Sequence, residues 1–274
     1  MNLIPFILGQ IFFTGSVDMQ YWKWREPDEE RLQGIFDVAG YWENWEIGGK
    51  FLYLQPSRLT KPKYEDLAQK YAAYNSDLVS ARVGSYYVSW GRGLIIASIR
   101  DDQLMLDRWL EGGDVTARWG PVEGEFLSGT KREIYYYEFK KDTDHTMRAG
   151  RLSLVGIPHL ELTGAYARIN QPTYDSTYKQ EFSSGAVAVN FPLVNAYGEL
   201  VRREGFYDEF YYAGDSTPDT STTSYYAAIS VGLPKFNVLL ESKDYNLLAN
   251  GFSNPPPINK YGVYLSEELD EAGH

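Results

Sequence analysis

The sequence predicts an all-β protein, an antiparallel, up-and-down transmembrane β-barrel of about 14 strands. Three observations favour this fold class. Apolar and polar residues alternate with a period of two in one stretch after another, as in strands with one apolar face. Prolines separate these stretches, and because proline has no N–H to give to a strand ladder, each marks a connection. Short connections alternate with long ones, which is typical of the two rims of a membrane barrel.

The clearest repeat of this pattern is the stretch 151–169. Apolar residues alternate with polar ones on both sides of Pro158, so the stretch is predicted to be a hairpin that turns there. The same arrangement surrounds Pro121, Pro192 and Pro234. We therefore expect each of these prolines in a short turn between paired strands.

In chain order, the apolar stretch 1–10 has two open interpretations, the remnant of a secretory signal or the lead into a first strand at 11–24. A hairpin follows at 33–53, with its turn at Glu43 and Asn44. The stretch 67–74 is the weakest strand prediction, because its surroundings fit two helical turns equally well.

Beyond that point the pattern resumes at 78–89 and breaks over 90–111, which we interpret as an inserted loop. Hairpins are then predicted at 114–130, 151–169, 184–202 and 225–245, and a final strand near Lys260. Long polar connections lie at 56–64, 132–145, 171–179 and 206–224. The whole chain, 1–274, is thus predicted to be a single β-barrel domain.

Alternation alone does not say which face of the strands meets water. Charges of both signs occur on the polar face of nearly every hairpin, which suits a water-filled lumen better than a protein core. The residues expected to line the lumen are Asp37, Glu46, Lys50, Arg82, Arg118, Glu123, Glu125, Arg151, Glu161 and Glu241.

Aromatic residues gather near the predicted strand ends, as in the two interfacial girdles of a membrane barrel. Beside the short turns lie Trp42, Trp45, Trp119, Phe191 and Phe236. Toward the long loops lie Tyr135, Tyr136, Tyr137, Tyr174, Tyr178, Tyr207, Tyr211, Tyr212, Tyr225 and Tyr226.

Composition excludes several function classes. The net charge of −11 argues against a nucleic-acid partner, and the absence of cysteine excludes thiolate metal sites. The histidines, His145, His159 and His274, lie far apart, so no metal site is expected. No nucleotide-binding fingerprint occurs, and we expect no cofactor. Catalysis is not expected either, although Glu123 and Glu125 share a strand face as glycosidase carboxylates could.

The stretch 84–113 carries the most distinctive motif. Gly91 and Gly93 flank Arg92 and allow the chain to fold sharply. This pattern resembles a family of uncharacterised outer-membrane β-barrel proteins of Gram-negative bacteria, over roughly residues 83–131. The matching residues are Trp90, Gly91, Arg92, Gly93, Leu94, Arg100, Asp101, Asp102, Leu106, Asp107 and Gly112.

The resemblance implies a fold and a cellular location, and it carries no information about an activity. Members of the family are longer and end in an aromatic strand, which the stretch 269–274 lacks. The resemblance therefore implies that this chain is a piece of a longer member and that its barrel is incomplete. Three interpretations of the inserted loop stay open: a solvated extracellular loop, a loop that folds into the lumen and narrows it, or an active site. The candidate constriction residues are Trp90, Gly91, Arg92, Gly93, Arg100, Asp101, Asp102 and Asp107.

These features favour an outer-membrane barrel that acts as a porin-like conduit or in a structural or surface-binding role. Its expected partners are the lipid bilayer and small polar solutes, and the sequence does not indicate an oligomeric state. Two other functions remain: a soluble, secreted β-sandwich or carbohydrate-binding domain that uses exposed Trp and Tyr, and an outer-membrane hydrolase.

Overall fold

The computed structural model describes residues 11–24, 29–55, 64–98, 100–101, 106–135, 145–172, 177–208, 220–233, 235–245, 258–260 and 263–265. Throughout these residues the fold is all-β, as predicted, and none of them belongs to a helix that could cross a membrane. The chain forms two compact units, Met1–Tyr86 and Tyr87–His274.

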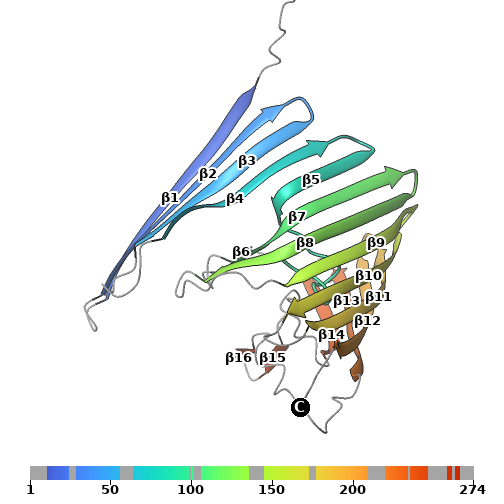
Figure 1. Ribbon diagram of the computed structural model, residues 1–274. Coiled ribbons are helices and arrows are strands. Elements are labelled where there is room, and N and C mark those ends of the chain that lie inside the picture. Colours follow the sequence, from blue (N-terminus) through green and yellow to red (C-terminus); the bar gives the residue numbers. More distant parts are fainter. Residues whose placement is uncertain are drawn as a thin grey trace, which may run out of the picture. The chain divides into compact units, whose positions relative to one another are not determined.

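The first unit is an antiparallel meander in which each strand pairs with the next one in the chain (Figure 1). Its strands are β1 (Phe12–Trp24), β2 (Glu29–Trp42), β3 (Trp45–Gln55), β4 (Tyr64–Asn75) and β5 (Val79–Tyr86). The predicted turn at Glu43 and Asn44 is confirmed, because Trp42 pairs with Trp45. The ambiguous stretch 67–74 is strand, within β4.

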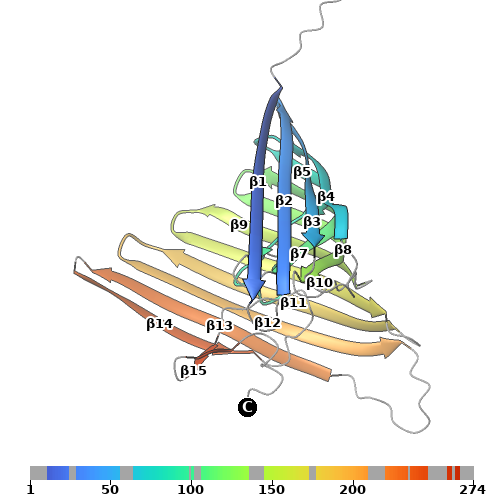
Figure 2. The ribbon, with the colours of Figure 1, turned by 90° about the vertical axis from the view of Figure 1, so that its left-hand side faces the viewer.

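The second unit repeats the same topology, and Figure 2 shows its later strands side by side in chain order. Its strands are β6 (Arg100–Asp101), β7 (Leu106–Trp119), β8 (Val122–Tyr135), β9 (Thr146–Ile157), β10 (Leu160–Pro172), β11 (Thr177–Asn190), β12 (Val194–Asp208), β13 (Thr220–Leu233) and β14 (Phe236–Asp244). The antiparallel, up-and-down arrangement is therefore confirmed, whereas closure of the strands into a barrel stays a prediction.

Prolines mark the short turns as expected. Pro121 lies between β7 and β8, Pro158 between β9 and β10, and Pro192 between β11 and β12. Pro234 falls outside the described residues. The predicted hairpin at 151–169 is confirmed, and in it Leu162 lies opposite Leu154 and Ile169 opposite Met147.

Two boundaries differ from the prediction. Strand β7 begins at Leu106, so the inserted loop does not extend to residue 111. The alternation was lost there because Asp107, Arg108, Trp109 and Leu110 are all buried, on both faces of the strand. The final strand predicted near Lys260 is present, but it lies outside the meander. It is β15 (Ile258–Lys260), which pairs with β16 (Val263–Leu265) in a separate two-stranded sheet.

Many large apolar side chains are exposed in each unit, whereas several charged side chains of the protein are buried. Ile47 is 65% exposed and Leu152 61%, whereas Lys50 on the opposite face is 5% exposed. We call these the apolar face and the polar face. The exposed set on the apolar face of the second unit includes Val115, Phe126, Leu162, Val187, Leu200, Ile229 and Leu240. A soluble sheet has the reverse pattern, with its apolar face buried.

Aromatic side chains near the short turns are exposed, namely Trp42, Trp45, Trp119, Phe191 and Phe236. The tyrosines near the long loops do not all lie on the same face. Tyr225 is exposed, but Tyr226 is 3% exposed and lies on the polar face, so its assignment to an outward girdle is wrong. Successive residues of a strand point to opposite faces, and two adjacent tyrosines cannot both face outward. Tyr136, Tyr137, Tyr174, Tyr211 and Tyr212 lie outside the described residues, as do the side chains of Tyr135 and Tyr207.

Candidate functional site: a hairpin on the polar face

The polar face of the second unit carries a small hairpin, residues 88–98, between the last strand of the first unit and β6. The Trp90 N–H donates to the Ile96 carbonyl at 3.0 Å, and the Ser98 N–H donates to the Val88 carbonyl at 2.8 Å. Leu94, Ile95 and Ile96 are fully buried. We call this element the loop hairpin.

The tip of the loop hairpin is bound to β12. The Arg92 N–H donates to Glu199 Oε2 at 3.1 Å, and the Tyr197 hydroxyl donates to the same oxygen at 2.6 Å. The Arg92 guanidinium lies over two tyrosine rings, 5.1 Å from the centroid of Tyr197 and 5.5 Å from that of Tyr226. Such cation–π contacts are worth about 0.5–2 kcal/mol each.

Gly91 is required by this contact. Its φ is +56°, in the left-handed region, and a Cβ added to it would lie 2.4 Å from Glu199 Oε2 and 2.6 Å from the Tyr197 hydroxyl. With any larger residue, either the tip or the ends of the Glu199 and Tyr197 side chains would have to move. The glycine of the sequence motif thus serves close packing as well as chain reversal.

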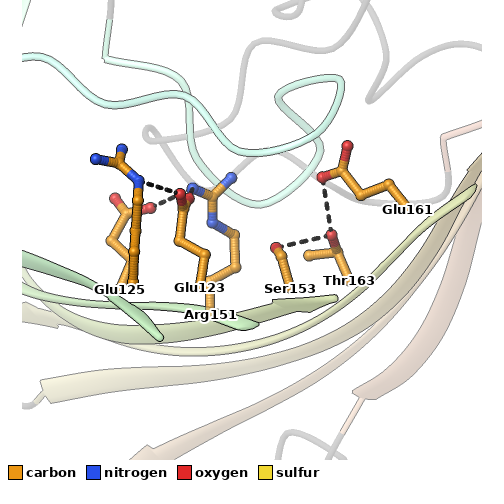
Figure 3. A network of polar contacts seen from close by, with 7 residues as sticks. Glu123, Glu125, Arg151, Ser153, Glu161 and Thr163 are labelled. Atoms are coloured by element: carbon orange, nitrogen blue, oxygen red, sulfur yellow. Dashed lines mark hydrogen bonds and ion pairs between the residues drawn. The ribbon is translucent and has the colours of Figure 1, made fainter. Parts of the chain in front are cut away.

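On its other side the loop hairpin meets an ion-pair network. The Arg151 guanidinium lies 5.8 Å from the centroid of the Trp90 ring. Arg151 Nη2 is 2.6 Å from Glu125 Oε2 and 3.3 Å from Glu123 Oε1, and Arg118 Nε is 2.8 Å from Glu123 Oε2. Figure 3 shows the labelled carboxylates and Arg151 rising from the strands on the same side as the hairpin segment.

A second polar chain continues the network along β9 and β10. The Ser153 and Thr163 hydroxyls are 2.9 Å apart, and Thr163 donates to Glu161 at 3.4 Å (Figure 3). Glu161 borders two cavities. One, of about 60 Å³, lies under the hairpin tip beside Trp90 and Glu199. The other, of about 420 Å³, lies beside Arg92 and is open.

Of the predicted constriction residues, Trp90, Gly91, Arg92 and Gly93 lie together in the loop hairpin. Asp107 lies in β7 and accepts a hydrogen bond from the Tyr87 hydroxyl at 2.6 Å. Arg100 and Asp101 form β6, whose side chains are not described, and Asp102 lies outside the described residues.

The predicted lumen residues share the polar face within each unit. In the second unit they include the network above and Glu241, which accepts from Tyr226 and lies 3.5 Å from Lys243 Nζ. In the first unit Asp37 is half-buried and Lys50 buried. There the Tyr71 hydroxyl donates to Glu46 at 2.5 Å, and Arg82 Nη2 lies 3.8 Å from the same carboxylate.

Three residues of the site were missed: Tyr197, Glu199 and Tyr226. The sequence signal that could have found Tyr197 and Glu199 is their position in the alternation along the strand. Tyr197 and Glu199 are two residues apart and alternate with Gly198 and Leu200, so they belong to the polar face by the same rule as the predicted charges. No rule of sequence, however, pairs them with a hairpin tip 107 residues away.

Among the described residues no group of three or more His, Asp or Glu side chains is placed to hold a metal ion. The site therefore consists of ion pairs, aromatic rings and cavities.

A family model described as a family of unknown function (DUF6029) matches residues 24–150. No curated protein matches this chain. Several solved structures are similar to it. An anion-selective porin from Comamonas acidovorans has a TM-score of 0.49 and 11% identity, covering 85% of this chain and 78% of the porin. Outer-membrane expressed OmpT of Vibrio cholerae has a TM-score of 0.42 and 10% identity, covering 97% and 96%. Salmonella typhi OmpF in complex with daunomycin has a TM-score of 0.39 and 11% identity, covering 88% and 92%.

Proposed function

We propose that this protein is an outer-membrane β-barrel of a Gram-negative bacterium that conducts small polar solutes and has no catalytic activity. In this proposal the loop hairpin narrows the passage. Because the three similar structures have TM-scores below 0.5 and identities near 10%, support comes from the side-chain geometry instead. The observation that carries it is the exposure of the apolar face together with the burial of charges on the polar face.

The exposed apolar face supports the lipid bilayer as a partner. Moving one large apolar side chain out of water is worth about 1.5–3 kcal/mol. The second unit exposes such side chains on every strand from β7 to β14. A soluble protein rarely exposes a continuous apolar patch above several hundred Å². Acyl chains would cover this face without a second protein layer.

Strand length supports the same partner. A tilted transmembrane strand needs about 9–11 residues to cross the hydrocarbon core. β8 has 14 residues, β10 has 13 and β12 has 15. Each is long enough to cross, with its ends at the level of the lipid headgroups.

The polar face supports a wet lumen. It holds carboxylates and guanidinium groups within one network, and such groups are costly to bury unless they are paired or hydrated. In a water-filled lumen these groups would be both paired and hydrated. The 420 Å³ cavity beside Arg92 is the space along this face that a small polar solute could use.

Two measurements test the proposal. The protein should fractionate with outer membranes and migrate differently on an SDS gel before and after boiling, as folded barrels do. Reconstituted into a planar lipid bilayer, it should give discrete steps of ionic current. Monodisperse behaviour in detergent-free buffer would exclude the membrane part of the proposal, and a silent bilayer would exclude conduction.

A further inference from the structure

We infer that Glu199 is the positioning residue that fixes the loop hairpin on the polar face and thereby sets the width of the passage. This inference rests on the proposed conduit function. Glu199 belongs to β12, and no sequence motif connects it with the hairpin. Its contacts with Arg92 and Tyr197 are the link between the two elements.

The two hydrogen bonds to Glu199 make this link strong. Glu199 is 6% exposed, and a buried carboxylate needs donors to replace its lost water. The Arg92 N–H and the Tyr197 hydroxyl supply them, both to Oε2. If the tip moved away, the carboxylate would lose one donor and the Arg92 N–H its acceptor. Hydrogen bonds to charged groups are stronger than those between neutral groups.

The tip held by this link separates two spaces. The 60 Å³ cavity and the 420 Å³ cavity are both lined by Gly91, Glu161, Ala188 and Tyr197. Gly91 therefore lies in the partition between them. The smaller space admits about two water molecules and no solute. Release of the tip would join the two cavities and widen the path along the wall.

The central experiment compares the single-channel conductance of the wild type, Glu199→Ala and Glu199→Gln in planar bilayers. Glu199→Ala removes the acceptor, so conductance should rise. Glu199→Gln keeps a carbonyl oxygen for the Arg92 N–H but loses the charge, so conductance should stay near the wild-type value. Glu204→Ala is the matched control, because Glu204 lies on the same strand, is exposed and pairs with Arg202.

A second readout does not depend on conduction. The chain has no cysteine, and Leu94 in the hairpin is 0% exposed, so a Leu94→Cys thiol reports release of the hairpin without background. Its reaction with a small methanethiosulfonate reagent should be slow in the wild-type background and roughly tenfold faster with Glu199→Ala, from the loss of one strong hydrogen bond. Ser89→Cys, at an exposed position of the same hairpin, should react quickly in both.

A glycine pair tests the same contact without touching Glu199. Gly91 and Gly120 have nearly the same φ, +56° and +58°, but only at Gly91 would a Cβ meet other atoms within 4 Å. Alanine at either position carries similar backbone strain. Gly91→Ala should raise conductance and thiol reactivity, and Gly120→Ala should change neither.

The outcomes separate the two proposals. A wild type that conducts, with Glu199→Ala unchanged in conductance and in thiol reactivity, overturns the role of Glu199 and leaves the conduit intact. A wild type that does not conduct overturns the conduit, while thiol reactivity still decides whether Glu199 holds the hairpin. If Glu199→Ala fails to fold, judged by heat modifiability, the Gly91→Ala and Gly120→Ala pair decides.

Discussion

At the scale of single residues, we expect substitutions at buried charges to change the free energy of unfolding most. The Glu125 side chain is 7% exposed, and its contact with Arg151 is 2.6 Å long. Removing one partner of a buried ion pair costs more than the pair contributes, because the other charge stays buried without compensation. Exposed pairs behave differently, since water replaces the lost partner. The two kinds of pair can be compared within this chain.

We expect Arg151→Met to lower the free energy of unfolding by about 2–4 kcal/mol, because it leaves Glu125 uncompensated. Arg202→Met should cost less than about 1 kcal/mol. Arg202 and Glu204 form a similarly short pair, 2.8 Å against 2.6 Å, but their side chains are 61% and 52% exposed. Urea unfolding in lipid vesicles, followed by tryptophan fluorescence, measures both. Equal losses would mean that the polar face is not shielded from water around Arg151.

A second comparison concerns two turn residues whose backbone conformation favours glycine. Glu43 and His159 both have positive φ, 50° and 65°, which side-chain-bearing residues rarely adopt. Glu43→Gly should stabilise the protein, by at most about 1 kcal/mol, because Gly has no Cβ penalty there. His159→Gly should destabilise it. His159 Nδ1 lies 2.6 Å from the Asn190 carbonyl, and the ring stacks on Phe191. Unfolding midpoints that move in the same direction would contradict this account.

At the scale of elements, the hairpins with short turns were predictable and the loop hairpin was not. Pro121, Pro158 and Pro192 fixed the turns, and period-two alternation fixed which residues share a face. Both signals are local. The docking of the loop hairpin depends on Glu199, far away in the sequence, and on a close approach at Gly91. Local patterns show that Gly91 permits a sharp turn, but they do not show what it packs against.

The wall beneath the loop hairpin gives a prediction of selectivity. Glu161 lines both cavities and accepts a hydrogen bond from Thr163, and no ion pair to it occurs in the described part of the structure. By contrast, Glu123 and Glu125 are paired with arginines. An uncompensated carboxylate on a narrow passage attracts cations and repels anions. Glu161 should therefore influence ion selectivity more than its neighbours do.

We expect Glu161→Lys to shift the reversal potential in a KCl gradient toward anion preference, and Glu161→Gln to shift it part of the way. Glu204→Lys is the control, because Glu204 is exposed and lies on neither cavity. Conductance and heat modifiability should show that each variant still folds and opens. A reversal potential unchanged by Glu161→Lys would show that solutes do not pass this wall.

At the scale of the whole molecule, the central question is what covers the apolar face. In each unit the positions predicted to be apolar and opposite the charges are exposed, as Ile47 is in the first unit and Val115 and Leu162 are in the second. Alternation has the same form in a soluble sheet, so only exposure separates the two environments. Alternation does not predict closure of the strands into a barrel either, because its period is the same whether or not the first and last strands pair.

A charge placed on the apolar face distinguishes lipid from water. Leu152 lies in the middle of β9 and is 61% exposed, whereas Ile157 ends the strand beside the short turn and is 42% exposed. In a bilayer an arginine costs about 2–4 kcal/mol at the midplane and about 0–1 kcal/mol near the interface. In water, both positions would tolerate arginine within about 0.5 kcal/mol, as exposed sites usually do.

We therefore expect Leu152→Arg to destabilise the vesicle-reconstituted protein by about 2–4 kcal/mol and Ile157→Arg by less than about 1 kcal/mol. Leu152→Met, which keeps an apolar side chain of similar volume, should stay close to the wild type. Urea titrations in vesicles measure all three. The difference between the two arginine variants is the decisive quantity, because it depends on depth in a bilayer and has no counterpart in water. Equal stability of both arginine variants would mean that the apolar face does not contact lipid.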